Sequence, residues 1–129
     1  MVNFGVWMVI QLLQPQELEV YYLLPALRSE LAKALKLQGK SQKEIAQLFG
    51  ISEPAVSQYV HEKRGADVEF TPELQKMIAD SAKRIADNVT FIRETQLLLQ
   101  KVWKEKFICT VCHDQNGTAI PKNCGVCYE

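Results

Sequence analysis

Apolar residues recur at helical spacing between residues 15 and 39. Pro15 is suited to the first turn of a helix and Gly39 to a helix end. Steps of three and four residues place apolar side chains on one face of a helix. The pattern therefore predicts a run of short helices, whose apolar positions are Leu18, Tyr21, Tyr22, Leu24, Leu27, Leu31, Ala34 and Leu35.

Residues 41–63 show the spacing of two short helices that meet at a sharp turn. Ser41 and Glu44 can form a capping box, and Gly50 can adopt the left-handed conformation that ends the first helix. Ser52 can cap the second helix, and Ala46 supplies the small side chain needed where the two helices cross closely. The pattern predicts a helix-turn-helix whose apolar wedge consists of Ile45, Phe49, Ile51, Val56 and Tyr59.

The second helix of such a motif enters the major groove of DNA, where its outward side chains meet base edges. Gln58 can bond bidentately to adenine, Glu53 can accept from cytosine, and Pro54 can touch a thymine methyl group. Other polar and basic side chains suit the phosphates, which fix register without reading sequence. The candidate base contacts are Glu53, Pro54, Ser57, Gln58 and His61 (His61 being better suited to a phosphate), and the candidate phosphate contacts are Gln42, Lys43, Ser52, Lys63 and Arg64.

The overall charge favours no particular partner, because the chain has 15 basic and 15 acidic residues. Between Arg28 and Arg64, however, seven basic residues stand against four acidic ones. This modest local excess suits a surface that faces phosphates. Hydrophobic residues make up 47% and charged residues 23% of the chain, which is typical of a globular domain rather than a disordered one.

A second helical pattern begins at Thr71 and Pro72, and no proline or glycine follows until Gly117. It predicts one long helix over residues 71–106 with a coiled-coil period near 3.5 residues. About 35 helical residues span on the order of 50 Å, more than a small domain can cover, so we expect homodimerisation. The alternative is a helix packed on its own domain. The expected seam is Ile78, Ala82, Ile85, Val89, Ile92, Gln96, Leu99 and Trp103.

All four cysteines lie within residues 107–129, as two CxxC pairs separated by eleven residues. Paired CxxC knuckles are typical of tetrahedral zinc sites, so we predict a four-cysteine zinc knuckle. An iron–sulfur cluster is an alternative that would make the protein a redox sensor, and a reversible dithiol switch is a third. His113 could replace one ligand but is better interpreted as a polar surface residue. The expected ligands are Cys109, Cys112, Cys124 and Cys127.

Residues 1–14 form a mainly apolar segment. They lack the basic start and the small-residue cleavage site of a secretory signal, and the run is shorter than the roughly 20 residues that span a bilayer. We expect them to pack in the core or a dimer interface, with Met8 as an alternative natural start. We expect a cytoplasmic protein without membrane contact.

The marks of a known family occur in the stretch LPALRSELAKALKLQGKSQKEIAQLFGISEPAVSQYVHEKRG. They are Leu24–Pro25, Arg28, Ala46, Gly50, Ala55–Val56–Ser57 and Lys63–Arg64–Gly65. This stretch resembles the N-terminal half of archaeal predicted transcriptional regulators with a phage-repressor-like (XRE-type) helix-turn-helix. The resemblance is close over residues 15–65 and looser up to the cysteine pairs. It implies a sequence-specific, dimeric DNA-binding protein.

Together these features predict an all-α protein with a helix-turn-helix domain at residues 15–66, a long dimerisation helix and a small metal module. Its expected partner is double-stranded DNA and its expected role is transcription regulation. We expect no enzyme and no small-molecule substrate, because no glycine-rich phosphate loop is present and four-thiolate zinc lacks an open coordination position. The alternative is a protein-interaction adaptor in which zinc knuckles dock a partner.

Overall fold

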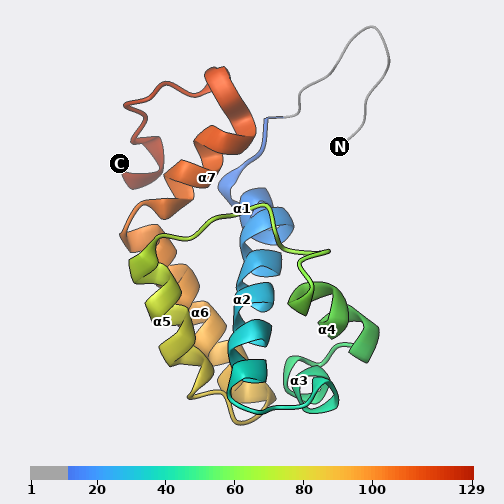
Figure 1. The fold of residues 1–129 in the computed structure, drawn as a ribbon. Coiled ribbons are helices and arrows are strands. Elements are labelled where there is room, and N and C mark those ends of the chain that lie inside the picture. The colour runs from blue at the N-terminus through green and yellow to red at the C-terminus, as the bar shows by residue number, and fades with distance from the viewer. Residues whose placement is uncertain (1–11) are drawn as a thin grey trace, which may run out of the picture.

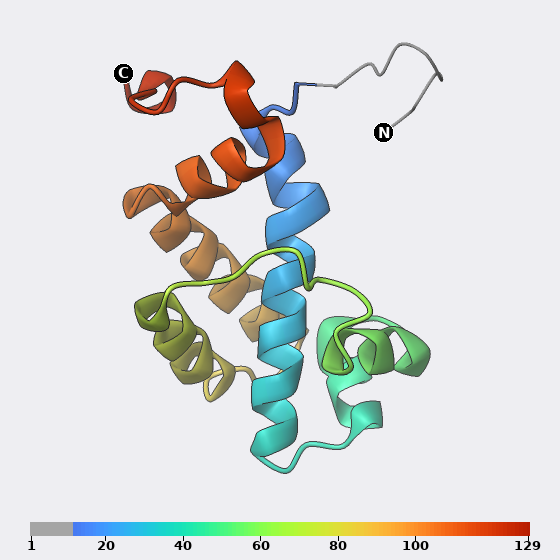
Figure 2. The same ribbon diagram turned by 45° about the horizontal axis from the view of Figure 1, so that its top comes forward.

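The computed structural model describes residues 12–129, which form helices joined by loops, with no β-strand in that range. The all-α fold is therefore confirmed. Helix α2 lies at the centre, α3 and α4 on one side of it and α5 and α6 on the other, while α7 crosses the end near α1 (Figure 1). The turned view shows the same arrangement (Figure 2). Of the apolar N-terminal segment, residues 1–11 lie outside the described residues, and Leu13 is buried.

The first helix is continuous, whereas the sequence pattern predicted a run of short helices. It consists of α1 (Pro15–Leu18), a π-helical turn η1 (Glu19–Leu23) and α2 (Leu24–Leu37). The cause is Pro25, which has no N–H to donate to Tyr21 and whose ring would crowd that carbonyl. The π turn adds a residue, so that the Leu24 N–H donates to the Glu19 carbonyl and the helix passes the proline without breaking.

The predicted helix-turn-helix is formed by α3 (Gln42–Phe49) and α4 (Glu53–Val60). The capping box is confirmed: the Glu44 N–H donates to Ser41 Oγ over 3.1 Å, and the Ser41 N–H donates to Glu44 Oε1 over 3.0 Å. Gly50 has the expected left-handed conformation, with φ +66°. Ser52 Oγ accepts from the Ala55 N–H over 3.3 Å. These local signals set where both helices begin and how sharply the chain turns.

Two neighbouring helices hold the helix-turn-helix in place. From α2, the buried Ser29 hydroxyl donates to the Tyr59 carbonyl over 2.9 Å. From the start of α6, Asn88 Nδ2 lies 2.7 Å from the Gln47 carbonyl and 2.9 Å from that of Leu48, so it satisfies backbone acceptors at the end of α3. The helix-turn-helix is therefore anchored from two directions.

The prediction of one long helix over residues 71–106 is wrong. The chain forms α5 (Pro72–Ala82) and α6 (Asn88–Lys104), which turn back on each other beside α2. The break is stabilised by Asp87, whose carboxylate accepts from the Thr90 N–H over 2.8 Å, and by Thr90 Oγ1, which accepts from the Ala86 and Asp87 N–H groups. Short polar side chains of this kind compete with the helical backbone and favour a helix start.

This hairpin buries half of the predicted dimer seam inside one chain. The seam residues Ile78, Ala82, Ile85 and Leu99 are buried in the core, whereas Val89 and Ile92 are 70% and 59% exposed. The alternative of packing on the same domain therefore describes the structure better. The length argument for a dimer no longer holds, because no single helix spans residues 71–106.

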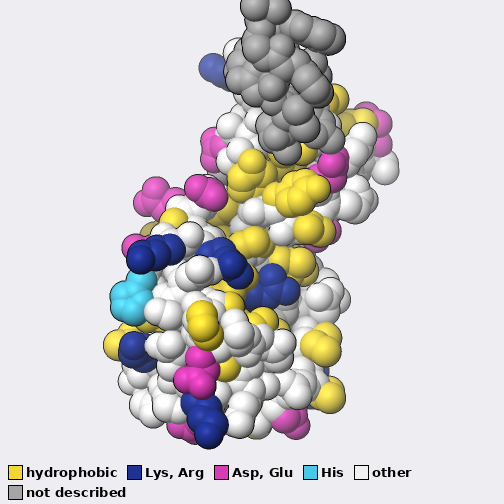
Figure 3. Space-filling view, turned by 90° about the vertical axis from the view of Figure 1, so that its right-hand side faces the viewer, with side chains coloured by type: hydrophobic (Ala, Val, Ile, Leu, Met, Phe, Trp, Pro, Cys, Tyr) yellow, Lys and Arg dark blue, Asp and Glu magenta, His cyan; other side chains and the backbone are white. Residues whose placement is uncertain are grey.

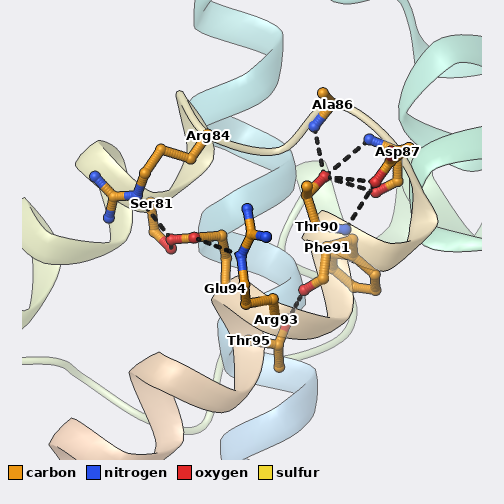
Figure 4. A network of polar contacts seen from close by, with 9 residues as sticks. All are labelled: Ser81, Arg84, Ala86, Asp87, Thr90, Phe91, Arg93, Glu94 and Thr95. Atoms are coloured by element: carbon orange, nitrogen blue, oxygen red, sulfur yellow. Dashed lines mark hydrogen bonds and ion pairs between the residues drawn. The ribbon is translucent and has the colours of Figure 1, made fainter.

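A buried carboxylate joins the two helices of the hairpin, as Figure 4 shows. Glu94 Oε1 accepts from the Ser81 hydroxyl over 2.7 Å and from Arg84 Nε over 3.0 Å. Burial acts to raise the pKa of Glu94, but the hydrogen bonds from Ser81 and Arg84 outweigh it and hold the pKa below its ordinary value. The ionised form of Glu94 is thus the one that the fold stabilises.

This network predicts acid sensitivity. A depressed folded-state pKa contributes stability above the unfolded value, near 4.5, and that contribution is lost as the pH falls through the folded pKa. We expect Glu94→Gln to be less stable than the wild type at pH 7 and the difference to shrink at pH 3–4. Urea denaturation at both pH values checks this. Because Glu44, Glu62 and Asp87 also have lowered pKa values, only the difference between the two proteins isolates Glu94. A gap that stays constant with pH would contradict the prediction.

The cysteine region begins with a helix, α7 (Phe107–Asn116), followed by the short turns η2 (Gly117–Ala119) and η3 (Val126–Tyr128). Phe107, Ile108 and Val111 are buried and belong to the same core as the rest of the domain. The expectation that each CxxC pair forms a knuckle is therefore wrong for the first pair, which lies on a helix. The cause is this apolar stripe, which gives the segment a packed face independent of any cross-link.

Candidate nucleic-acid interface and cysteine cluster

The structure gathers the predicted DNA-contacting residues on the helix-turn-helix. Glu53 and Pro54 are exposed in the first turn of α4, and Ser57 and Gln58 are half-buried further along its outer face. The inner positions Val56 and Tyr59 are fully or nearly fully buried. One face of α4 is thus fixed in the core, so its other face presents side chains in a defined register. The remaining exposed candidates are Lys43, Ser52, His61, Lys63 and Arg64.

Several of these side chains already have an internal contact. Gln42 Nε2 donates to the Glu53 carbonyl over 3.1 Å, which ties the start of α3 to the start of α4. His61 Nδ1 lies 2.8 Å from the Ser57 carbonyl, which orients the ring along α4. The Arg64 guanidinium lies over the Tyr59 ring at 5.5 Å from its centroid. These contacts restrict the side-chain rotamers of an otherwise exposed surface and so lower the entropy lost on binding.

One basic residue of this region, Lys33, is paired within the domain. Lys33 Nζ lies 2.6 Å from Glu30 and 2.8 Å from Glu62, so its charge is balanced inside the domain. Figure 3 shows lysine and arginine side chains bordering a histidine along one edge of the lower part of this face. On that face the basic side chains lie among acidic, apolar and other side chains rather than in one continuous patch.

The four cysteines open into one cavity of about 180 Å³ between α7, the chain at residues 12–15 and the C-terminal turns. Cys109, Cys112 and Cys124 are half-buried, Cys127 is exposed, and none forms a disulfide. Burial, and then the neighbouring thiolates of the other three cysteines, raise the pKa of Cys109 above its ordinary value. The two pairs, separated by eleven residues in the sequence, thus meet at one place in the fold.

The cysteines do not form a coordination shell as they stand. Within residues 12–129, no three histidine, cysteine or acidic side chains are arranged closely enough to hold a metal ion. His113 points both ring nitrogens at backbone carbonyls, Nδ1 at Cys109 over 2.7 Å and Nε2 at Pro121 over 2.9 Å. The His113 ring therefore links α7 to the following loop and is not directed at the cluster as a ligand.

Sequence reasoning missed two asparagines that position these sites. Asn88 anchors the end of α3, and Asn116 pairs with the backbone of Leu13 beside the cysteines. Their partners lie about 40 and 103 residues away in the chain, so no local pattern marks either contact. The dipeptide Asn116–Gly117 is typical of a turn, but it does not indicate that Asn116 forms hydrogen bonds with a distant segment.

Comparisons with known proteins agree with the helix-turn-helix interpretation. A family model described as Sigma-70, region 4, matches residues 17–62, which run from the start of the first helix to just past α4. No curated protein and no solved structure matches the chain. Within the part of the chain that the structure describes, no helix is both long and apolar enough to cross a membrane. Residues 17–62 are thus similar to a helix-turn-helix DNA-binding module of transcription proteins.

Proposed function

We propose that the protein is a sequence-specific DNA-binding transcription regulator that reads the major groove with α4. The observation that carries this proposal is the capped, core-anchored helix-turn-helix with an exposed polar face on its second helix. The similarity to Sigma-70 region 4 and the resemblance to archaeal XRE-type regulators both point to DNA. We assign the contacts with bases and the contacts with phosphates to different residues.

Base reading is assigned mainly to Gln58, and phosphate contact to Lys43. Gln58 lies on the outer face of α4, opposite the buried Val56. Lys43 is exposed in the first turn of α3, next to Gln42, whose side chain contacts the start of α4. Gln42 acts as a positioning residue through its bond to Glu53, which holds α3 and α4 at a fixed distance.

Replacing these two residues is expected to reduce the affinity for DNA in different ways. Gln58→Ala is expected to weaken binding to the preferred duplex by about 1–3 kcal/mol and to relax its sequence preference, while Lys43→Ala weakens all duplexes alike. Titration of selected and random duplexes with each variant measures both effects. Exposed Gln47 on α3, replaced by alanine, is the matched control. Equal losses on both duplexes for Gln58→Ala would remove its base-reading role.

Salt dependence separates this proposal from the protein-interaction adaptor. Phosphate contacts release counterions, so the affinity for duplex DNA falls steeply with salt concentration, and each lost phosphate contact reduces the slope by about one unit. An adaptor whose helix-turn-helix is only a scaffold has no such slope. Binding to duplex DNA that is absent or insensitive to salt would favour the adaptor.

We also propose that the four cysteines hold one metal ion, with zinc first and an iron–sulfur cluster as the alternative. The donor chemistry fits, since the four cysteines line one cavity and soft thiolates suit both metals. The positions require the C-terminal turns to close toward α7, because no three ligands are gathered in residues 12–129. A bound zinc would cross-link these turns to the core.

The metal proposal predicts about one zinc ion per chain in protein purified without oxygen. Cys127→Ser is expected to lose most of it, because the exposed Cys127 is a ligand whose replacement disturbs no packing. Thr110→Ser, also exposed and between the first two cysteines, is the control. Metal and acid-labile sulfide analysis with an absorption spectrum decides between the two metals. A colourless sample without metal would refute the site.

A homodimer stays a prediction from the family resemblance. Val89 and Ile92 on α6 are apolar seam residues that the fold leaves exposed. A dimer would present two copies of α4, which could bind two half-sites of one operator. A strict monomer by light scattering, at concentrations that saturate DNA, would remove this part of the proposal.

A further inference from the structure

Asn116, the last residue of α7, joins the cysteine cavity to the chain just before α1. It is 5% exposed and lies one helical turn after Cys112, on the same face of the helix. Its Oδ1 accepts from the Leu13 N–H over 2.8 Å, and its Nδ2 donates to the Leu13 carbonyl over 3.1 Å. The second Nδ2 hydrogen is directed at Cys112 Sγ, 3.3 Å away.

This arrangement uses both N–H groups and the oxygen of one buried amide. The two bonds to Leu13 imitate the pairing of a β-bridge, and they fix the plane of the amide. With the plane fixed, the remaining N–H must point at Cys112 Sγ. The direction of the donor is thus set by the backbone of Leu13 and not by the sulfur itself.

We propose that Asn116 is a positioning residue of the cysteine site, which donates to the Cys112 thiolate and couples metal binding to the chain at residues 12–15. The inference rests on the proposed metal site. An amide donor gains strength when its acceptor becomes charged, so its bond to Cys112 is stronger in the metal-bound thiolate state. Donors of this kind, next to the ligands, typically change metal affinity by about 10- to 100-fold.

The coupling is reciprocal. If a thiolate at Cys112 strengthens the hydrogen bond from the Asn116 amide, it also stabilises the two hydrogen bonds between that amide and the Leu13 backbone. Leu13 and Pro15 line the same cavity as the cysteines, and Pro15 begins the continuous helix that ends beside α3. Metal binding therefore stabilises the point where the chain enters the helix that carries the reading motif.

The test replaces Asn116 with leucine, which has nearly the same shape but no hydrogen-bonding group. Asn123→Leu is the matched control, because Asn123 is exposed and directly precedes Cys124. Zinc affinity is measured on the full chain by competition with a chelator, and cobalt(II) serves as the spectroscopic probe. We expect zinc binding at least about tenfold weaker in Asn116→Leu. The sulfur-to-cobalt charge-transfer band should move to longer wavelength, because a thiolate that loses a donor holds its electrons less tightly. Asn123→Leu should change neither.

A measurement on the wild type keeps the inference testable if Asn116→Leu does not fold. Zinc is expected to slow hydrogen exchange of the Leu13 N–H, which donates to Asn116. Unchanged exchange at Leu13, or a wild-type affinity and band position in Asn116→Leu, would overturn the role of Asn116 alone. A wild-type protein that gives no cobalt charge-transfer band would refute the metal site itself, and the inference with it.

Discussion

Gly65→Ala is expected to lower the free energy of unfolding by about 3 kcal/mol or more, which is a large share of a small domain's stability. Gly65 has φ +78°, and a Cβ atom there would lie 2.2 Å from the Pro25 carbonyl oxygen and 2.6 Å from its carbon. Both contacts are with helix backbone, which cannot rotate away as a side chain can. The loop from α4 to α5, or the helix at Pro25, would have to shift.

Gly39→Ala separates the steric contact from backbone strain. Gly39 has a similar left-handed φ of +93° at the end of α2, but a Cβ atom there meets nothing within 4 Å. Its replacement is expected to cost only the conformational strain, about 1–2 kcal/mol. Urea denaturation of both variants, followed by circular dichroism, measures the difference. Equal losses would mean that the loop does not lie against Pro25 as the structure shows.

The close approach at Gly65 and the π turn at η1 both involve Pro25. Pro25 forces the preceding turn to widen, and the Gly65 backbone packs directly on the Pro25 carbonyl. The same loop then continues to Phe70, which is buried and stacks on Phe107 at 5.5 Å between ring centroids. A single crossing segment therefore links the reading motif, the central helix and the start of α7.

The helix-turn-helix could be predicted from sequence because its determinants are local. Ser41 and Glu44 lie three residues apart and bond to each other, and Gly50 needs only its own freedom at positive φ. Such signals do not depend on what the rest of the chain does. The apolar wedge was predicted for the same reason, since Ile45, Val56 and Tyr59 follow helical spacing and are all buried.

The break between α5 and α6 also had a local signal that the periodicity concealed. Asp87 and Thr90 stand at the spacing of a capping box, and in the structure they form one. The spacing of the apolar residues in α5 and α6 would also fit one continuous helix. Each of the two helices has its own apolar face, which it buries against α2 or against the other helix. Period alone could not distinguish one long helix from a hairpin, whereas the polar cap could.

In the cysteine region, the sequence predicted that the four thiols meet, but not the secondary structure that carries them. Two CxxC pairs predict four converging thiols, and the four line one cavity. That the first pair lies on a helix depends on Phe107 and Val111 packing into a core built by residues from the other end of the chain. The bonds between Asn116 and Leu13 span 103 residues and leave no trace in the sequence pattern.

Phe91→Ala is expected to cost about 3–5 kcal/mol, because it leaves a cavity at the junction of α6 and the reading motif. Phe91 is 9% exposed and stacks on Phe49, with ring centroids 4.2 Å apart and planes inclined by 14°. Phe49 is the last residue of α3, so this stack and the Asn88 bonds are what hold α3 against the hairpin. The loss is measured as the change in urea midpoint multiplied by the slope of unfolding.

Ile92→Ala is the matched control for that measurement. Ile92 is the next residue on α6 and 59% exposed, so its truncation removes apolar surface without opening a cavity and is expected to stay within about 0.5 kcal/mol. If Phe91→Ala cost no more than Ile92→Ala, the aromatic stack would contribute little, and the helix-turn-helix would be held by the Ser29 bond from α2 and the Asn88 bonds from α6. A large difference instead makes the hairpin part of the scaffold that fixes α4 for DNA. Recognition would then depend on a helix pair that itself touches no base.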